Sequence, residues 1–130
     1  MRRGLLTAAA AALAGSLAVA LGAGGASAGS AQLHAAASTK TVKVGDDFFD
    51  PTKVTIRQKD VVKWVWVGAD GKPGETANEH TVTEIHDKFT SKLLTKGSYS
   101  RRFKTAGTFK ILCAEHPDTM RMKVVVKKRS

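Results

Sequence analysis

Short segments in which apolar and polar side chains alternate constrain the fold of this chain most strongly. They run from residue 41 to residue 127. A two-residue period places the apolar side chains on one face of a β-strand. Only residues 87–95 suit a turn or a short helix, and no segment suggests a long amphipathic helix. Seven strands are therefore predicted, over residues 41–44, 53–57, 61–67, 81–85, 99–103, 108–112 and 122–127.

Turn-forming residues separate these strands at regular intervals. Gly45-Asp46-Asp47, Ala106-Gly107 and His116-Pro117-Asp118 are typical of tight turns, and residues 68–79 form a long polar loop. Short strands at such spacing are typical of a β-sandwich. The length of 130 residues allows one small domain and leaves little room for a second. We therefore predict an all-β fold, a β-sandwich.

The N-terminal segment has the organisation of an export signal. Met1-Arg2-Arg3 supplies positive charge, residues 5–21 are mostly Ala and Leu, and Ala26-Ser27-Ala28 is a small-x-small cleavage signal. The apolar run is short and glycine-rich for a membrane span, so we expect no stable membrane insertion after cleavage. We predict a secreted or extracytoplasmic protein of a bacterial periplasm or cell envelope. The predicted organisation is a signal peptide over 1–28, a flexible leader over 29–39 and a folded domain over 40–130.

The charge balance is basic, with 21 Lys and Arg against 11 Asp and Glu and a net charge of +10. Loss of Arg2 and Arg3 with the signal peptide leaves 19 against 11, a net charge of +8. Basic residues are scattered over many strands and form no single stripe with interleaved aromatics, so we expect no nucleic-acid partner. This scatter therefore disfavours a function as an interaction module that binds acidic polysaccharide, membrane or nucleic acid. The net charge favours protein partners with acidic surfaces.

The lone cysteine, Cys113, excludes an intrachain disulfide and a cysteine-rich zinc module. One unpaired cysteine in an exported chain indicates an intermolecular bridge, a reactive thiol or a thiol that holds a metal. A buried and inert cysteine is the alternative for an isolated residue. The residues around Cys113 therefore have to distinguish between these roles.

A thiol, an imidazole and a thioether lie within eight residues, at Cys113, His116 and Met120, on the loop between two predicted strands. A second imidazole, His80, opens a strand 33 residues upstream. Strand ends can meet at one pole of a sandwich. Two imidazoles, one thiolate and a weak axial thioether are the ligand set of a blue-copper site, and a thioether adds little for zinc. The spacing alone leaves His86 as an alternative to His80, and Met122 as an alternative to Met120.

These motifs resemble the cupredoxins, above all the plastocyanin, amicyanin and pseudoazurin group. The resemblance covers about residues 40–128 and includes Phe48-Phe49-Asp50-Pro51, Trp64 and the segment 103–109. It implies a Greek-key sandwich of about seven to eight strands and one mononuclear type 1 copper ion. It further implies that His80, Cys113, His116 and Met120 hold the copper, and it favours His80 over His86.

The sequence departs from the cupredoxin pattern at two positions near these ligands. Thr81 stands where Asn is commoner, and we expect its backbone N–H still to donate to the thiolate. Trp66 stands where Asn is usual, which indicates altered packing near the site. Met122 occupies a position that is usually small in the family, whereas Met120 ends the loop, so the resemblance favours Met120.

The resemblance implies a secreted carrier that shuttles single electrons between extracytoplasmic redox proteins. We expect no enzyme activity, because a saturated ligand set leaves no open position for a substrate. A copper-binding or copper-delivery protein without a shuttle role is the alternative. We expect a monomer that exposes His116 to its partner and docks on an acidic surface.

Overall fold

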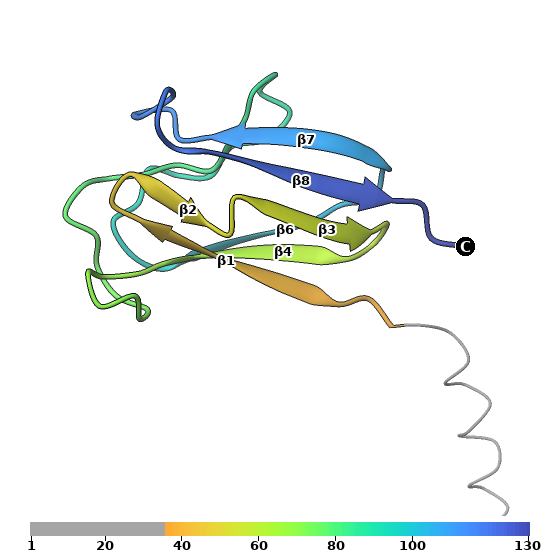
Figure 1. Cartoon of the computed structure of the whole chain (residues 1–130), viewed down its shortest axis with the longest axis horizontal. Helices are drawn as coiled ribbons and strands as arrows, with labels where there is room; N and C mark the ends of the chain where they lie inside the picture. The colour runs from red at the N-terminus through yellow and green to blue at the C-terminus, as the bar shows by residue number, and fades with distance from the viewer. Residues whose placement is uncertain (1–35) are drawn as a thin grey trace, which may run out of the picture. The chain divides into compact units, whose positions relative to one another are not determined.

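The computed structural model describes residues 36–130, and the predicted signal peptide and most of the predicted leader lie outside the described residues. The described part is built of strands, and within it no helix is long and apolar enough to cross a membrane. Figure 1 shows the course of the chain. The strands are β1 (Thr39–Gly45), β2 (Phe48–Asp50), β3 (Lys53–Arg57), β4 (Val61–Trp66), β5 (Thr83–Glu84), β6 (Ser98–Arg102), β7 (Gly107–Leu112) and β8 (Arg121–Lys127).

The strands form two four-stranded sheets, with the orders β2-β1-β4-β6 and β3-β8-β7-β5. Each sheet contains one parallel pair, β1 with β4 and β3 with β8, and its other neighbours are antiparallel. Strands that pair in parallel are far apart in the chain, so the connections cross between the sheets. The predicted all-β sandwich is confirmed, and its eight strands fall within the expected number.

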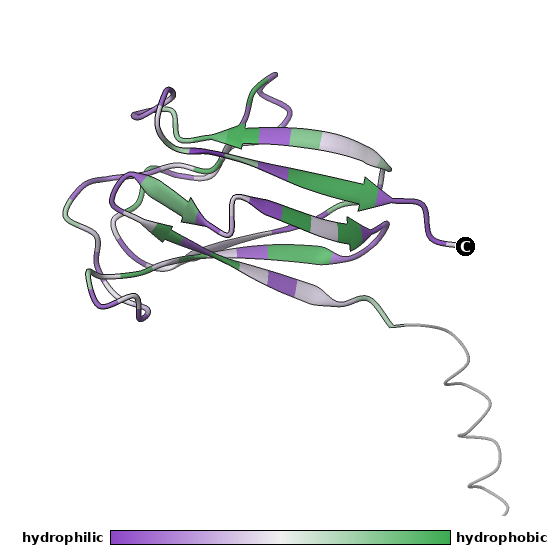
Figure 2. Cartoon of the chain, in the orientation of Figure 1, coloured by the Kyte–Doolittle hydropathy of each residue, from purple (hydrophilic) through white to green (hydrophobic). Residues whose placement is uncertain are grey.

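The alternation of the sequence corresponds to inward and outward faces. In β4 the side chains of Val62, Trp64 and Trp66 are fully buried, and in β8 those of Val124 and Val126 are buried too. Figure 2 shows apolar and polar residues alternating along β3 (Lys53–Arg57), and an apolar stretch followed by polar residues in β8. Burial of apolar surface between the two sheets is the main favourable contribution to folding. The sandwich thereby provides a rigid frame for the loops at its ends.

Two elements differ from the sequence prediction. Residues 48–50, which lie outside the predicted strands, form the short strand β2, in which only Phe49 faces the core. The predicted strand 81–85 is reduced to β5. Val82 and Thr83 instead bond to residues 90 and 91 through side chains and a single bridge. The segment 87–95 is irregular, with single bridges at Thr90 and Leu94, and the structure shows no helix there.

Three connections converge at one end of the sandwich. They are the two-residue turn from β1 to β2, the long segment from β4 to β5, and the loop from β7 to β8 (Figure 1). Hydrogen bonds link the first connection to the second, and the second to the third. All the residues singled out as copper ligands lie on the second and third connections. The fold thus brings together segments that are more than 30 residues apart in the chain.

Candidate metal centre

The loop after β7 is tied together by its own backbone. The Cys113 N–H donates to the carbonyl of Met120 at 3.1 Å, which closes the base of the loop. Inside the loop, His116 N–H donates to the Cys113 carbonyl at 3.1 Å and Met120 N–H to the His116 carbonyl at 3.0 Å. These bonds fix the backbone positions of Cys113, His116 and Met120 relative to one another.

His80 is held from its backbone and is completely buried. Its N–H donates to the Leu94 carbonyl at 2.9 Å, and the Leu94 N–H donates back at 3.0 Å. This two-way bridge anchors the chain just before β5 and leaves the imidazole free to point into the end of the sandwich. The exposed His86 lies outside the group of neighbouring donor atoms.

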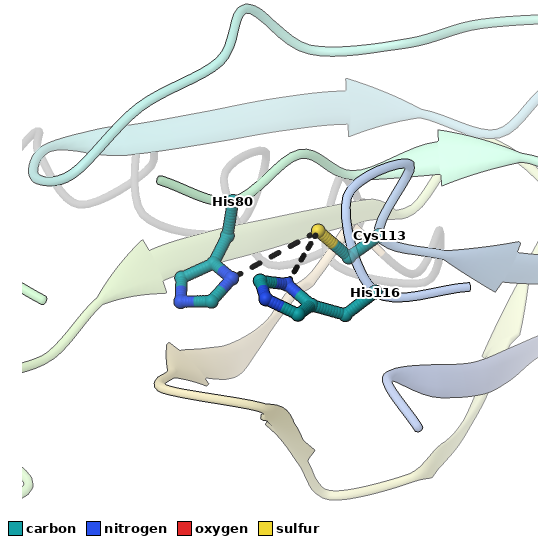
Figure 3. Close-up of side chains that lie close together, drawn as sticks. All are labelled: His80, Cys113 and His116. Atoms are coloured by element: carbon teal, nitrogen blue, oxygen red, sulfur yellow. Dashed lines mark hydrogen bonds between the residues drawn. The ribbon is translucent and has the colours of Figure 1, made fainter. Parts of the chain in front are cut away.

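The side chains of His80, Cys113 and His116 converge on one point (Figure 3). Sγ of Cys113 lies 3.8 Å from Nδ1 of His80 and 3.7 Å from Nδ1 of His116. A ligand atom from each of the three residues lies within 4.8 Å of the other two. One thiol and two imidazole nitrogens at such short separations suit a copper ion, which prefers this mixture of sulfur and nitrogen donors.

The thiol of Cys113 is fully buried and receives a backbone hydrogen bond. Thr81 N–H approaches Sγ at 3.4 Å, as the sequence led us to expect. The hydroxyl oxygen of Thr81 also accepts the Ala114 N–H at 2.8 Å and lies 2.9 Å from the hydroxyl of Thr83. Thr81 therefore connects the segment that carries His80 to the loop that carries Cys113.

The two methionines lie in different surroundings. Met120 ends the loop and is fully buried, next in the chain to the strand that starts at Arg121. Met122 lies within β8, and its sulfur accepts the Trp64 Nε1–H at 3.2 Å. Because that sulfur is occupied by the Trp64 indole, Met120 is the better candidate for a thioether beside the three donor atoms.

The far nitrogens of both imidazoles face carboxylates of one turn. Asp46 Oδ1 lies 3.0 Å from His80 Nε2, and Asp47 Oδ1 lies 3.4 Å from His116 Nε2. Hydrogen bonds from Ala77 N–H and the His80 ring lower the pKa of Asp46 from 3.8 to about 2. The sequence marked these two residues only as a turn. Two adjacent acids in a turn do not reveal in the sequence which histidines they contact, because the two imidazoles follow 34 and 69 residues later.

Comparison with known proteins identifies the family. A model described as copper binding proteins, plastocyanin/azurin family, matches residues 36–127. The structure resembles amicyanin from Paracoccus versutus (Thiobacillus versutus), with 26% identity, a TM-score of 0.53 and coverage of 75% of this chain and 87% of that chain. It also resembles a proline-to-glycine variant of amicyanin in its reduced Cu(I) form at pH 4, with 24% identity, a TM-score of 0.57 and coverage of 73% and 88%.

A larger protein shares the fold. The copper-containing nitrite reductase from Thermus scotoductus SA-01 matches with 19% identity and a TM-score of 0.56, over 69% of this chain and 22% of that chain. No curated protein matches the chain. The chain belongs to the copper-binding plastocyanin/azurin family, and the predicted cupredoxin resemblance is confirmed. Its cofactor is one copper ion, which the His80, Cys113 and His116 donors fit.

Proposed function

We propose that His80, Cys113, His116 and Met120 hold a type 1 copper ion, and that the protein shuttles single electrons between extracytoplasmic redox partners. The observation that carries the proposal is the position of Cys113 Sγ, 3.8 and 3.7 Å from two imidazole Nδ1 atoms. Copper, when bound, supplies a one-electron couple between Cu(I) and Cu(II). The family and its amicyanin relatives support this reading.

The chain contributes rigidity and desolvation to this couple. Two of the three clustered donors, His80 and Cys113, are fully buried, and backbone bonds fix both segments that carry them. The Thr81 N–H points at the sulfur and is placed to stabilise the negative charge that a copper-bound thiolate would carry. Donors that keep one arrangement in both oxidation states minimise the rearrangement that accompanies each electron.

His116 provides the exit toward a partner. About 30% of its side chain is exposed, whereas the side chain of His80 has no exposed surface. Ala114 and Pro117 on the same loop are exposed and give an apolar rim around the ring. We propose that the protein is a monomer and that redox partners with an acidic docking surface approach this rim. We further propose that it is an electron carrier and not an enzyme.

The location of the protein is part of the same proposal. The export signal predicted over residues 1–28 places the mature chain in the periplasm or cell envelope. An extracytoplasmic location suits a carrier that meets its partners outside the cytoplasm. Cell fractionation with an antibody to the folded domain tests this placement, and recovery of the full-length chain in the cytoplasm would contradict it.

Absorption and electron paramagnetic resonance spectra of the copper-loaded protein test the copper assignment. The wild type is expected to show an intense thiolate-to-copper band and fast, reversible oxidation and reduction. Cys113→Ser removes the thiolate and is expected to abolish the blue colour. His86→Ala is the matched control, since His86 is exposed and lies outside the donor group, and is expected to keep the colour.

Two results would contradict the proposal in different ways. A strong blue spectrum in the Cys113→Ser variant would overturn the ligand assignment. A wild type that binds copper but does not cycle reversibly would favour the alternative, a copper-binding or copper-delivery protein without a shuttle role.

A further inference from the structure

We propose that Asp46 is a positioning residue for His80, because its carboxylate fixes the tautomer and the orientation of the imidazole that faces Cys113. The inference rests on the proposed function, which gives Nδ1 of His80 the role of a copper donor. It adds a residue from a third segment of the chain, the turn between β1 and β2, to the machinery of the site.

The contact itself sets the tautomer. Asp46 Oδ1 lies 3.0 Å from Nε2 of His80, within hydrogen-bond distance, and the imidazole is completely buried. A neutral imidazole carries one N–H, and an ionised carboxylate only accepts hydrogen bonds. The proton must therefore reside on Nε2, which leaves the lone pair of Nδ1 directed toward the Cys113 sulfur, 3.8 Å away.

The carboxylate is itself held in place. Its Oδ2 accepts the Ala77 N–H at 2.8 Å, and its Oδ1 accepts the Asn78 N–H at 2.9 Å, with the Asn78 amide group at 3.4 Å. Ala77 and Asn78 directly precede the segment that carries His80. Hydrogen bonds with these two residues and with the His80 ring therefore hold the carboxylate in one orientation. The β1–β2 turn thereby clamps both the backbone and the ring of the ligand.

An anion on the far nitrogen has a chemical consequence. A carboxylate that accepts the remaining N–H of a metal-bound imidazole fixes the ring and raises its basicity, and loss of such a partner typically lowers metal affinity about 10- to 100-fold. The negative charge also favours the higher positive charge of Cu(II) over Cu(I). Asp46 is therefore expected to lower the reduction potential as well as to orient His80.

Asp47 offers an internal comparison within the same turn. Its Oδ1 lies 3.4 Å from Nε2 of His116, and its side chain is 58% exposed, against 39% for Asp46. Its backbone has a φ of 67°, a left-handed conformation that Asp and Asn tolerate. Water screens a carboxylate in such an exposed position. The same negative charge should therefore influence His116 much less than Asp46 influences His80.

The test replaces Asp46 by Asn, which keeps the side-chain volume and one acceptor oxygen but removes the charge. Asp118→Asn is the control, because it removes the same charge from the copper loop at a side chain that is 95% exposed. In copper-loaded protein, Asp46→Asn is expected to reduce the preference for Cu(II) about tenfold, a rise of about 59 mV in a one-electron potential. The control is expected to shift it by less than half as much.

Nitrogen-15 nuclear magnetic resonance of the reduced protein gives a second readout. In the wild type the proton of His80 is expected on Nε2 and protected from exchange with solvent, and Asp46→Ala is expected to lose that protection. Equal potential shifts in Asp46→Asn and Asp118→Asn, or an unprotected Nε2 proton in the wild type, would overturn this inference alone. A wild type without a blue copper spectrum would overturn the proposed function instead.

Discussion

At the scale of single residues, His80 and His116 differ in solvent exposure and in the carboxylate that each one faces. His80 is sealed from solvent and bonded to a fixed carboxylate, whereas His116 is part exposed and faces a carboxylate in water. Under the proposed ligand assignment, His80 therefore holds the geometry and His116 reaches the partner. This division follows from the fold, because His80 precedes a buried strand and His116 lies on a loop tip.

Met120 is expected to adjust the reduction potential more than it holds the metal. An axial thioether is a long and weak copper ligand. Met120→Leu should keep the blue colour and raise the potential, because a donor that stabilises Cu(II) is lost. The swap nearly conserves side-chain volume, so the cost in unfolding free energy should stay below about 1.5 kcal/mol. Cyclic voltammetry and urea unfolding measure the two effects.

Met122→Leu is the matched control for this prediction. It should leave the potential unchanged but deprive the buried Trp64 Nε1–H of its acceptor, at a cost of about 1–3 kcal/mol. If Met122→Leu shifts the potential and Met120→Leu does not, the axial ligand has been assigned to the wrong methionine.

At the scale of elements, the sequence predicted the regular strands well and their irregular partners poorly. The alternation over 53–57 and 122–127 matches β3 and β8 closely, because apolar side chains fall on one buried face of each strand. The three-residue β2 was missed, since one inward side chain makes no periodic pattern. The candidate donors on the copper loop could be predicted because they lie close together in the chain. Asp46 could not, because only the sheet topology brings it to His80.

A buried ion pair ties three elements together at the end of the sandwich away from the copper loop. Asp60, in the turn between β3 and β4, accepts backbone N–H groups of Ser38 and Arg57 and pairs with Arg129 at 2.5 Å. Burial alone would raise the pKa of Asp60, but these N–H donors and the Arg129 guanidinium outweigh it and hold the pKa below 3.8. This carboxylate therefore links the start of β1, the end of β3 and the C-terminal segment.

Asp60→Ala is expected to lower the unfolding free energy by about 3 kcal/mol at neutral pH, because it leaves buried donors and Arg129 without their partner. A lowered folded-state pKa means that the stabilisation is complete above the unfolded-state pKa. It is lost as the pH falls through the folded-state value. The difference between wild type and variant should therefore stay constant above about pH 5 and shrink below it. Urea unfolding across a pH series measures it.

Asp118→Ala serves as the control for this pH series. Its carboxylate is almost fully exposed and lies 3.9 Å from Arg121, so its removal should change the unfolding free energy by no more than about 0.5 kcal/mol. A difference between wild type and Asp60→Ala that grows toward acid pH would contradict the proposed role of the ionised Asp60.

For the whole folded domain, positive charge predominates but is unevenly placed. The end of the sandwich that carries Asp60 also carries Lys59, Lys104 and Lys128, on two turns and the C-terminal segment. The connections around the copper loop are richer in acids, including Asp47, Glu115 and Asp118. At long range a partner experiences the net positive charge, whereas close to His116 it meets carboxylates. The two effects act over different distances, so the dependence of the electron-transfer rate on salt concentration distinguishes them.

Electron exchange with small redox reagents is expected to report the long-range effect of the net positive charge, above all at low ionic strength. Fields from exposed charges are screened over roughly 8 Å at physiological salt, so they steer an approaching reagent mainly at low ionic strength. The net charge of +8 expected for the mature chain should speed an anionic reagent and slow a cationic one. The rate with the anionic reagent should fall as salt rises, and the rate with the cationic reagent should increase. Stopped-flow oxidation of the reduced protein across a salt series measures both slopes.

Neutralising the local acids separates the two contributions to this rate. Glu115→Gln removes one carboxylate beside His116 and should raise the rate with the anionic reagent, most clearly at low salt. Glu75→Gln, on the exposed loop between β4 and β5, is the matched control and should have a smaller effect. If the wild-type rate with the anionic reagent is flat or rises with salt, the carboxylates around His116 govern the approach. A partner with a basic docking surface would then replace the acidic one proposed here, because the basic residues would lie too far from the electron-exit face to steer docking.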